Sequence, residues 1–187
     1  MLGDLLHQRR EVVHPRNRPE GKAIFVGLEH IESGTGRRLG HVDIEMSELT
    51  GRKPAFRQGD VVYGYLRPYL NKVWVAEFDG LCSVDQYVYS VNEDANADYV
   101  AWFLRSPLFL ERAPINVAPG QLPRIRTEEV ASVSIDLPSL TDQRRIANEL
   151  HRQMETVGRA RLSAERELEG IAALPAILLR RALLREV

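Results

Sequence analysis

The feature that most constrains this chain is a change of pattern at Pro138. Residues 139–169 contain no proline and a single glycine, Gly158, and from Ile146 onward apolar residues recur at steps of three, four or seven positions. That period predicts a helix, and the charged residues on its other faces are typical of a helix that packs against another helix. About thirty residues at 1.5 Å each give a helix of roughly 45 Å, which is longer than a small domain needs for its own core. The stripe consists of Leu140, Ile146, Leu150, Met154, Val157, Ala164, Leu168 and Ile171.

We therefore expect residues 138–187 to be a helical dimerisation and spacer region, whose first helix starts at a cap from Ser139 or Thr141. Gly170 and Pro175 are predicted to interrupt the helix, so that residues 175–184 form a second, shorter one. The alternative is a terminal helix that folds back on its own domain. The residues predicted to form the dimer contact are Ile146, Leu150, Met154, Val157, Leu168 and Ile171.

The preceding part of the chain, residues 1–137, is rich in short strand patterns. A helix is expected from Tyr99 to Leu104, ending before Pro107. Asp79-Gly80 predicts a tight hairpin turn between two strands. Strands are expected at residues 23–28, 42–46, 61–66, 73–78, 86–91 and 131–137, because β-branched and aromatic residues gather or alternate there. The fold class predicted is α+β, with a mixed β-rich domain followed by a long coiled-coil-type helix.

The loop at residues 66–72, Leu-Arg-Pro-Tyr-Leu-Asn-Lys, joins two of these strands. Its Arg67, Tyr69 and Lys72 offer cations and a phenol on a backbone that proline stiffens, a set that can grip phosphate and reach base edges. The alternative is a solvated turn whose Tyr69 and Leu70 fill the core. Further phosphate partners are expected in the basic segments before this loop, at Arg37, Arg38, Arg52, Lys53 and Arg57. In the proline-rich segment 113–127, Gln121 and Arg124 are candidates for groove contact.

Composition argues against catalysis more clearly than it argues for any partner. The chain has no phosphate-binding glycine loop, and its five histidines show no spacing typical of metal ligands. Its one cysteine, Cys82, excludes an intrachain disulfide and a multi-cysteine metal site, and is expected to be a core thiol. The net charge of −1, from 25 basic and 26 acidic residues, counts mildly against nucleic-acid binding. We therefore predict a protein that binds or scaffolds, with no metal and no cofactor bound directly.

The expected location is the cytoplasm, without membrane association. The first residues, MLGDLLHQRREVV, lack an apolar core of signal-peptide length. No run of 18 apolar residues occurs in the sequence.

Four segments, taken in order, resemble the specificity subunits of Type I restriction-modification systems. The run FRQGDVVYGYLRPYLNKVWVAEFDGLCSVDQYVY and the earlier AIFVGLEHIESGTG are similar to their target recognition domains. The segment LPRIRTEEVASVSIDLPSLTDQRRIANEL resembles the junction with their long helix, and LPAILLRRALL resembles the end of such a helix. Family members usually carry two recognition domains and two helices, whereas this sequence has one of each and no internal repeat, so it resembles a half-size form.

The resemblance implies sequence-specific recognition of double-stranded DNA on behalf of a separate adenine methyltransferase subunit. That partner would carry S-adenosylmethionine (SAM), and a restriction subunit could join the complex. A homodimer would then place two recognition domains on a bipartite palindromic site. Two alternatives stay open, a coiled-coil adaptor that binds protein alone and the recognition part of a split Type II-like methyltransferase.

Overall fold

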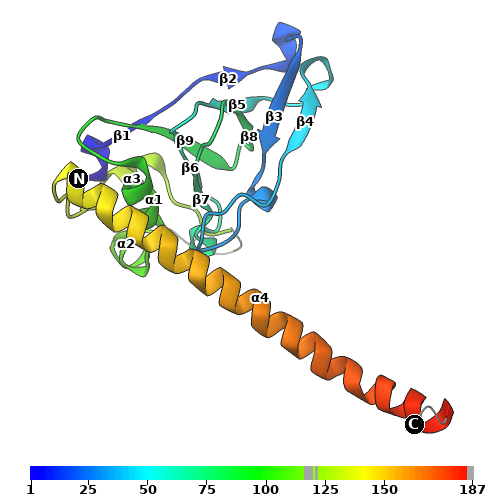
Figure 1. Cartoon of the computed structure of the whole chain (residues 1–187). Coiled ribbons are helices and arrows are strands. Elements are labelled where there is room, and N and C mark those ends of the chain that lie inside the picture. Colours follow the sequence, from blue (N-terminus) through cyan, green and yellow to red (C-terminus); the bar gives the residue numbers. More distant parts are fainter. Residues whose placement is uncertain (116–119, 121, 185–187) are drawn as a thin grey trace. The chain divides into compact units, whose positions relative to one another are not determined.

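The computed structural model describes residues 1–115, 120 and 122–184, which form two compact units, Met1–Ala147 and Asn148–Val187. The helices are α1 Ala97–Arg105, α2 Pro107–Arg112, α3 Thr127–Ala131 and α4 Leu140–Leu184 (Figure 1). Single 3-10 turns occur at η1 Leu2–Asp4, η2 Pro15–Asn17, η3 Leu28–His30, η4 Met46–Glu48 and η5 Pro68–Leu70. No helix in the described ranges has the length and apolar character needed to cross a membrane.

Two β-sheets form the framework of the first unit. The first sheet has the order β1-β9-β6-β7, with all pairs antiparallel. Its strands are β1 Leu6–Gln8, β9 Gln86–Val91, β6 Val61–Gly64 and β7 Val73–Val75. The second sheet has the order β2-β5-β8-β3-β4, in which β3 and β8 run parallel. Its strands are β2 Val12–Val13, β5 Lys53–Phe56, β8 Gly80–Cys82, β3 Lys22–Val26 and β4 Val42–Glu45. These strands and the helices that follow confirm the predicted α+β class.

The two faces of the first sheet pack against different layers because side chains alternate along a strand. Val61, Tyr63 and Tyr89 belong to a buried cluster with residues of α1, α2 and α3. Val62, Trp74 and Val88 belong to a second cluster that includes Phe56 and Cys82 of the second sheet. The first sheet is therefore the middle layer, with helices on one side and the second sheet on the other. Burial raises the pKa of the Cys82 thiol to about 12, so this residue is the predicted core thiol.

Asp79-Gly80 is not the predicted hairpin turn. β7 and β9 both flank β6, and β8 lies between them in the chain but pairs in the other sheet. Gly80 is required here because a Cβ atom would lie 2.6 Å from the Ile24 carbonyl oxygen and 2.7 Å from the Phe56 ring. Asp79 accepts hydrogen bonds from the Gln58 backbone N–H at 2.8 Å and from Arg57 at 3.1 Å. Gly80 thus permits a close approach of the backbone, and Asp79 forms an ion pair. The same two residue types are also typical of a turn, which is why the sequence predicted one.

The strand predicted at residues 131–137 is also absent, and α3 occupies its first position. Residues 133–139 have no regular secondary structure. Donors from other elements use the carbonyl groups that a neighbouring strand would need. The Leu2 N–H donates to Val133, the Arg112 guanidinium to Ser134, and the Tyr99 hydroxyl to Asp136.

The helix expected from Tyr99 begins two residues earlier, at Ala97, whereas the long helix begins next to Ser139 as expected. Asn96 caps α1 by accepting from the Tyr99 N–H at 2.9 Å, and α1 ends at Arg105 before Pro107. Ser139 caps α4, since its hydroxyl oxygen accepts from the Asp142 N–H at 3.2 Å. The predicted interruption of the long helix is wrong, because α4 continues through Pro175 to Leu184. Proline removes one backbone hydrogen bond from a helix. The other hydrogen bonds of this 45-residue helix remain, so the helix continues past Pro175.

Candidate nucleic-acid interface

The loop after β6 is joined to a segment nearly sixty residues later in the chain. Leu66 and Arg124 form an isolated antiparallel bridge. The Arg67 N–H donates to the Pro123 carbonyl at 2.8 Å, and the Ile125 N–H donates to the Tyr65 carbonyl at 3.2 Å. The structure therefore brings together Arg67 and Arg124, two of the predicted DNA-contacting residues from different segments.

The backbone of this loop is held in an uncommon shape. Arg67 and Asn71 have φ angles of 54° and 49°, and they bracket η5 Pro68–Leu70. Asparagine tolerates this left-handed region, whereas arginine adopts it rarely. Tyr69, between them, is 54% exposed, so it does not fill the core as the alternative interpretation of this loop required. The two neighbouring backbone contacts hold Arg67 at the surface.

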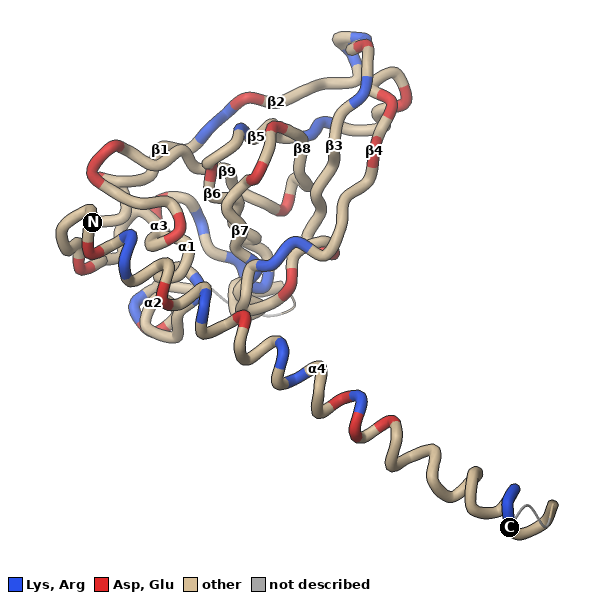
Figure 2. Tube along the Cα trace, in the orientation of Figure 1, with Lys and Arg blue, Asp and Glu red and all other residues tan. Residues whose placement is uncertain are grey.

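Many of the other predicted cations are already occupied by groups of the protein. The Lys72 ammonium donates to the Leu28 carbonyl at 2.6 Å, and the Lys53 ammonium lies 5.3 Å from the centre of the Phe25 ring. The arginine pairs are Arg37 with Glu32 at 3.2 Å, Arg38 with Glu77 at 2.8 Å, and Arg57 with Glu11 at 3.0 Å and Asp79 at 3.1 Å. Figure 2 shows basic and acidic residues interspersed along the trace of this unit. These residues stay predicted phosphate contacts, and each would have to share or exchange its present partner.

Three exposed arginines differ from that group. Within the described residues, the side chains of Arg52, Arg67 and Arg124 make no hydrogen bond and no ion pair. Burial raises the pKa of the Tyr65 hydroxyl, the charge of Asp85 adds to this, and the charges of Arg124 and Arg52 oppose it. The backbone also places Arg124 next to this tyrosine, because the N–H of the following residue, Ile125, donates to the Tyr65 carbonyl. Gln121, the remaining predicted groove contact, lies outside the described residues.

The structure adds an aromatic pair that the sequence interpretation missed. The rings of Tyr65 and Tyr87 stack with centroids 4.3 Å apart and planes 20° apart. Tyr65 follows β6 directly and is a diagonal neighbour of Tyr87 in β9, because Tyr63 lies opposite Tyr87 in the register. The signal was present in the sequence, since Tyr63 and Tyr65 repeat with period two, as do Tyr87 and Tyr89. Neither tyrosine repeat indicates by itself that the two segments pair with each other.

Exposed apolar side chains occur in the loop of Arg67 and in the segments whose backbones bond to Tyr65 and Arg67. Tyr69, Val84 and Leu122 are 54%, 43% and 45% exposed. Val84 precedes Asp85, whose carbonyl accepts from the Tyr65 N–H at 3.2 Å, and Leu122 precedes Pro123, which holds Arg67. Arginine donors with exposed apolar groups can match base edges and thymine methyl groups in a major groove.

The chain is similar in sequence and in structure to known proteins. A specificity subunit of the Escherichia coli Type I restriction enzyme EcoDI is 31% identical over 123 residues, which are 66% of this chain and 27% of that protein. The chain is homologous to Type I restriction enzyme specificity subunits. The crystal structure of an HsdS subunit from Thermoanaerobacter tengcongensis superposes with a TM-score of 0.74 and 25% identity, covering 100% of this chain and 48% of that one. No family model matches the sequence.

A second solved structure extends this relationship to a chain described in connection with complex assembly and conformational transition of the type I R-M system. It superposes with a TM-score of 0.75 at 26% identity, again covering 100% of this chain and 48% of that one. This specificity-subunit homologue thus spans about half the length of the solved chains that it matches.

The second unit of the specificity-subunit homologue presents apolar side chains along α4. Val157, Leu168 and Ile171 of the predicted stripe are 56%, 65% and 56% exposed. Leu150 and Met154 are half-exposed, and Ile146 lies in the first unit with the same intermediate exposure. Further exposed apolar residues that were not predicted follow the same helix, namely Leu162, Leu174, Ile177, Leu178, Leu179, Leu183 and Leu184.

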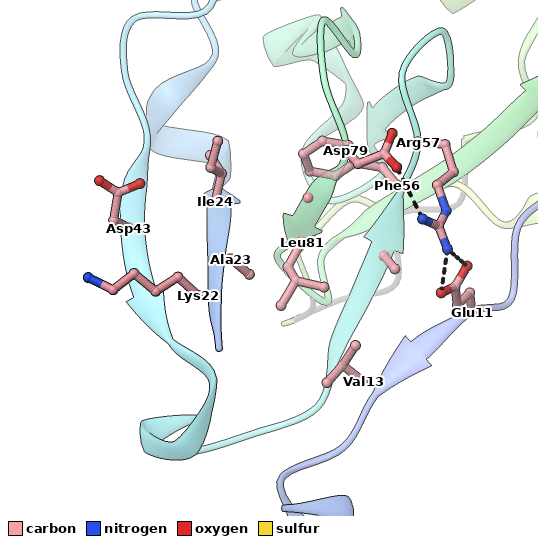
Figure 3. A pocket seen from close by; sticks show the side chains of 12 residues that line it. Glu11, Val13, Lys22, Ala23, Ile24, Asp43, Phe56, Arg57, Asp79 and Leu81 are labelled. Atoms are coloured by element: carbon pink, nitrogen blue, oxygen red, sulfur yellow. Dashed lines mark hydrogen bonds and ion pairs between the residues drawn. The ribbon is translucent and has the colours of Figure 1, made fainter. Parts of the chain in front are cut away.

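The second sheet carries a hollow of about 440 Å³. Val13, Ala55 and Leu81 give it apolar lining, and Figure 3 shows Arg57 between Asp79 and Glu11 at one side. Hydrogen bonds from the Gln58 N–H and then from Arg57 lower the pKa of Asp79. Both carboxylates therefore already neutralise Arg57, and the hollow offers no unpaired cation at this side for a phosphate.

Proposed function

We propose that this chain is the DNA-recognition subunit of a Type I-like restriction-modification methyltransferase, with residues 1–137 as its recognition domain. The observation that carries the proposal is the exposed cluster in which Arg67 and Arg124 are joined by backbone pairing beside Tyr65. Arginines without a carboxylate partner among the described residues can give their donors to phosphate or guanine without breaking an ion pair. Homology to specificity subunits supports the same assignment.

The chemistry would belong to a partner. The chain itself acts without catalysis, and a separate methyltransferase subunit binds SAM and modifies adenine. Two such subunits dock along the helical regions and the adjoining recognition domains, and a restriction subunit can join. The support for this partner is the relationship to subunits named as parts of Type I restriction enzymes.

The complex would contain two copies of this chain, paired through residues 138–187. The support is the apolar surface on α4, because burying each large apolar side chain contributes about 1.5–3 kcal/mol. A two-fold interface is self-complementary, so two identical helices can cover each other's stripes. The two recognition domains would then meet a palindromic target made of two half-sites.

A coiled-coil adaptor that binds protein alone is the second candidate. The observation in its favour is the pairing of Arg37, Arg38 and Arg57 with carboxylates, together with a net charge of −1. An adaptor needs no DNA, so measurements of DNA binding and of DNA methylation distinguish the two candidates.

The test is to compare adenine methylation across a genome with and without this chain, in cells that contain the methyltransferase subunit encoded beside it. DNA recognition predicts methylation at one palindromic motif that vanishes when the chain is removed. Binding of the purified complex to that motif should weaken steeply with salt, because phosphate contacts release counterions. Methylation that keeps its motif and extent without the chain would leave the adaptor as the better explanation.

A further inference from the structure

In the recognition unit, the backbone of Tyr65 bonds to two segments that carry charged side chains, at Asp85 and next to Arg124. Four arginines of the β-sheet region, Arg9, Arg37, Arg38 and Arg57, are held by carboxylates, as Arg9 is by Asp60 at 2.6 Å. Near Tyr65, the carboxylate of Asp85 and the guanidinium groups of Arg52 and Arg124 all influence one hydroxyl. Within the described residues, none of these three side chains makes a hydrogen bond or an ion pair.

Backbone pairing fixes this arrangement independently of the charges. The Tyr65 N–H donates to the Asp85 carbonyl, and the Tyr65 carbonyl accepts from the Ile125 N–H, both at 3.2 Å. Tyr65 therefore lies between Asp85 on one side and the segment of Arg124 on the other. β5 and β8 run antiparallel, with Ala55 opposite Leu81, so Arg52 before β5 and Asp85 after β8 leave the sheet at the same end.

The Tyr65 ring is itself held in place. It stacks on Tyr87, and Tyr87 belongs to the regular part of β9. A stacked ring on a paired strand has little freedom to rotate, so the groups beside it are kept apart at a defined position. An opposite pair of charges that is held near but not in contact is able to receive a ligand with complementary groups.

We propose that Arg124 and Asp85, on either side of Tyr65, read one G·C base pair in the recognised half-site. The inference rests on the proposed function, because it concerns how the same surface selects DNA. Guanine presents two acceptors in the major groove, N7 and O6, which match the fork of an arginine. Cytosine presents the N4 amino group, which donates to a carboxylate. An A·T pair places a donor where Arg124 needs an acceptor and offers Asp85 no amino group at the matching place.

Arg52 has a different part in this arrangement. Its charge acts on the pKa of the same tyrosine. Arg124 and Asp85 already contact both bases of the G·C pair, so no base edge of that pair is left for Arg52. Arg52 contacts a phosphate next to the G·C pair and sets affinity without sequence preference. The Tyr65 hydroxyl positions the two base-reading side chains only in the complex with DNA, through hydrogen bonds that form there, and its stacked ring keeps the place of the hydroxyl fixed.

The experiment measures which sequences the full complex methylates in a randomised DNA library, for the unmodified chain and for six variants. Arg124→Gln and Asp85→Asn should relax the preference at the same base pair, by roughly ten- to hundred-fold for G·C over A·T. The double variant should relax that pair no further. Arg52→Gln should lower methylation of all sequences alike and reduce the salt slope of binding by about one. Arg16→Gln, an exposed arginine on η2, is the matched control and should change nothing.

Tyr65→Phe separates positioning from folding. It retains the ring that stacks on Tyr87 and removes the hydroxyl, so the thermal midpoint should stay while the preference at that one base pair weakens. If Tyr65→Phe unfolds the chain, the exposed Arg124→Gln carries the test by itself. An unmodified chain that directs methylation to a motif, with variants Arg124→Gln and Asp85→Asn that keep the full motif, would overturn this inference and leave the proposed function intact. An unmodified chain that directs no methylation would overturn both.

Discussion

Gly36 and Arg105 approach so closely that a side chain at position 36 has no room. A Cβ atom on Gly36 would lie 1.8 Å from Nη1 of Arg105 and 2.1 Å from the Val73 carbonyl oxygen. That same Nη1 donates to the Thr35 carbonyl at 2.6 Å, and the guanidinium lies 3.9 Å from the centre of the Trp102 ring. Burial lowers the pKa of Arg105 to about 10, so the group is still charged at neutral pH and backbone carbonyls hold it. The segment that carries Arg37 and Arg38 is thereby fixed to α1.

Gly36→Ala should destabilise the recognition unit by more than about 1 kcal/mol, because the new methyl group meets both steric contact and a φ angle of 69°. Gly34→Ala is the matched control, since Gly34 has a φ angle of 77° but nothing within 4 Å of its added Cβ. Chemical denaturation of both variants measures the difference. Equal losses in the two variants would show that the approach of Arg105 adds no cost.

Removing Arg9 should leave the buried Asp60 carboxylate without its charged partner, with the Arg57 N–H at 2.7 Å as a remaining donor. Asp60 is 3% exposed and accepts two hydrogen bonds from Arg9, at 2.6 and 2.9 Å. Arg9→Met is expected to lower the free energy of unfolding by about 1.5–3 kcal/mol. The exposed neighbour gives a control in Arg10→Met, which should change stability by less than about 0.5 kcal/mol. Thermal and denaturant unfolding at neutral pH would show whether the ion pair has this effect.

Gln143 should matter more than an ordinary helix residue because three backbone groups depend on its amide. Its side-chain oxygen accepts from the Asn96 N–H at 2.8 Å, and its nitrogen donates to the carbonyls of Asp94 and Pro138. Gln143→Met keeps the size and removes all three bonds, which should cost at least about 1–3 kcal/mol. Gln153→Met, at an exposed position of the same helix, is the control. A Gln143→Met protein as stable as the control would contradict this account of where α4 begins.

The proposed dimer makes a prediction about two exposed residues of α4. Val157 and Ile171, each 56% exposed, are expected to be buried when two chains pair. Val157→Asp combined with Ile171→Asp should convert the dimer to a monomer in light scattering and leave the recognition unit folded. Arg166→Asp, on the opposite side of the helical period, should leave the dimer intact. A protein that is monomeric before any substitution, both alone and with its methyltransferase, would refute the pairing.

Arg67 offers a test of the loop itself. Arg67→Asn keeps a residue that tolerates the φ angle of 54° while removing the cation. If Arg67 binds phosphate, affinity should fall for all DNA sequences and the salt slope should decrease by about one. The control is Arg67→Lys, which retains the charge and should retain much of the slope. Binding curves at several salt concentrations decide the matter, and an unchanged slope for Arg67→Asn would place the phosphate contacts elsewhere.

The sequence by itself determined the elements whose signals are local. The period of residues 139–169 specified a long helix, Ser139 was one of two residues expected to cap it and does so, and β9 runs over the predicted residues 86–91. Each of these follows from alternation or capping within a few positions. The repeated tyrosines of β6 and β9 were visible as well, although their meeting was not.

Tertiary structure decided everything that depends on partners far along the chain. Asp79-Gly80 fits the sequence signal of a turn, but the approach of Ile24 and Phe56 made it part of a strand pairing. Residues 131–137 alternate as a strand does, but hydrogen bonds from Leu2, Tyr99 and Arg112 replaced the strand neighbours. The arginines look alike in sequence, and only folding separated those paired with carboxylates from Arg67 and Arg124. The physical reason is that charge pairing and close packing depend on distances between remote segments, and no local pattern contains those distances.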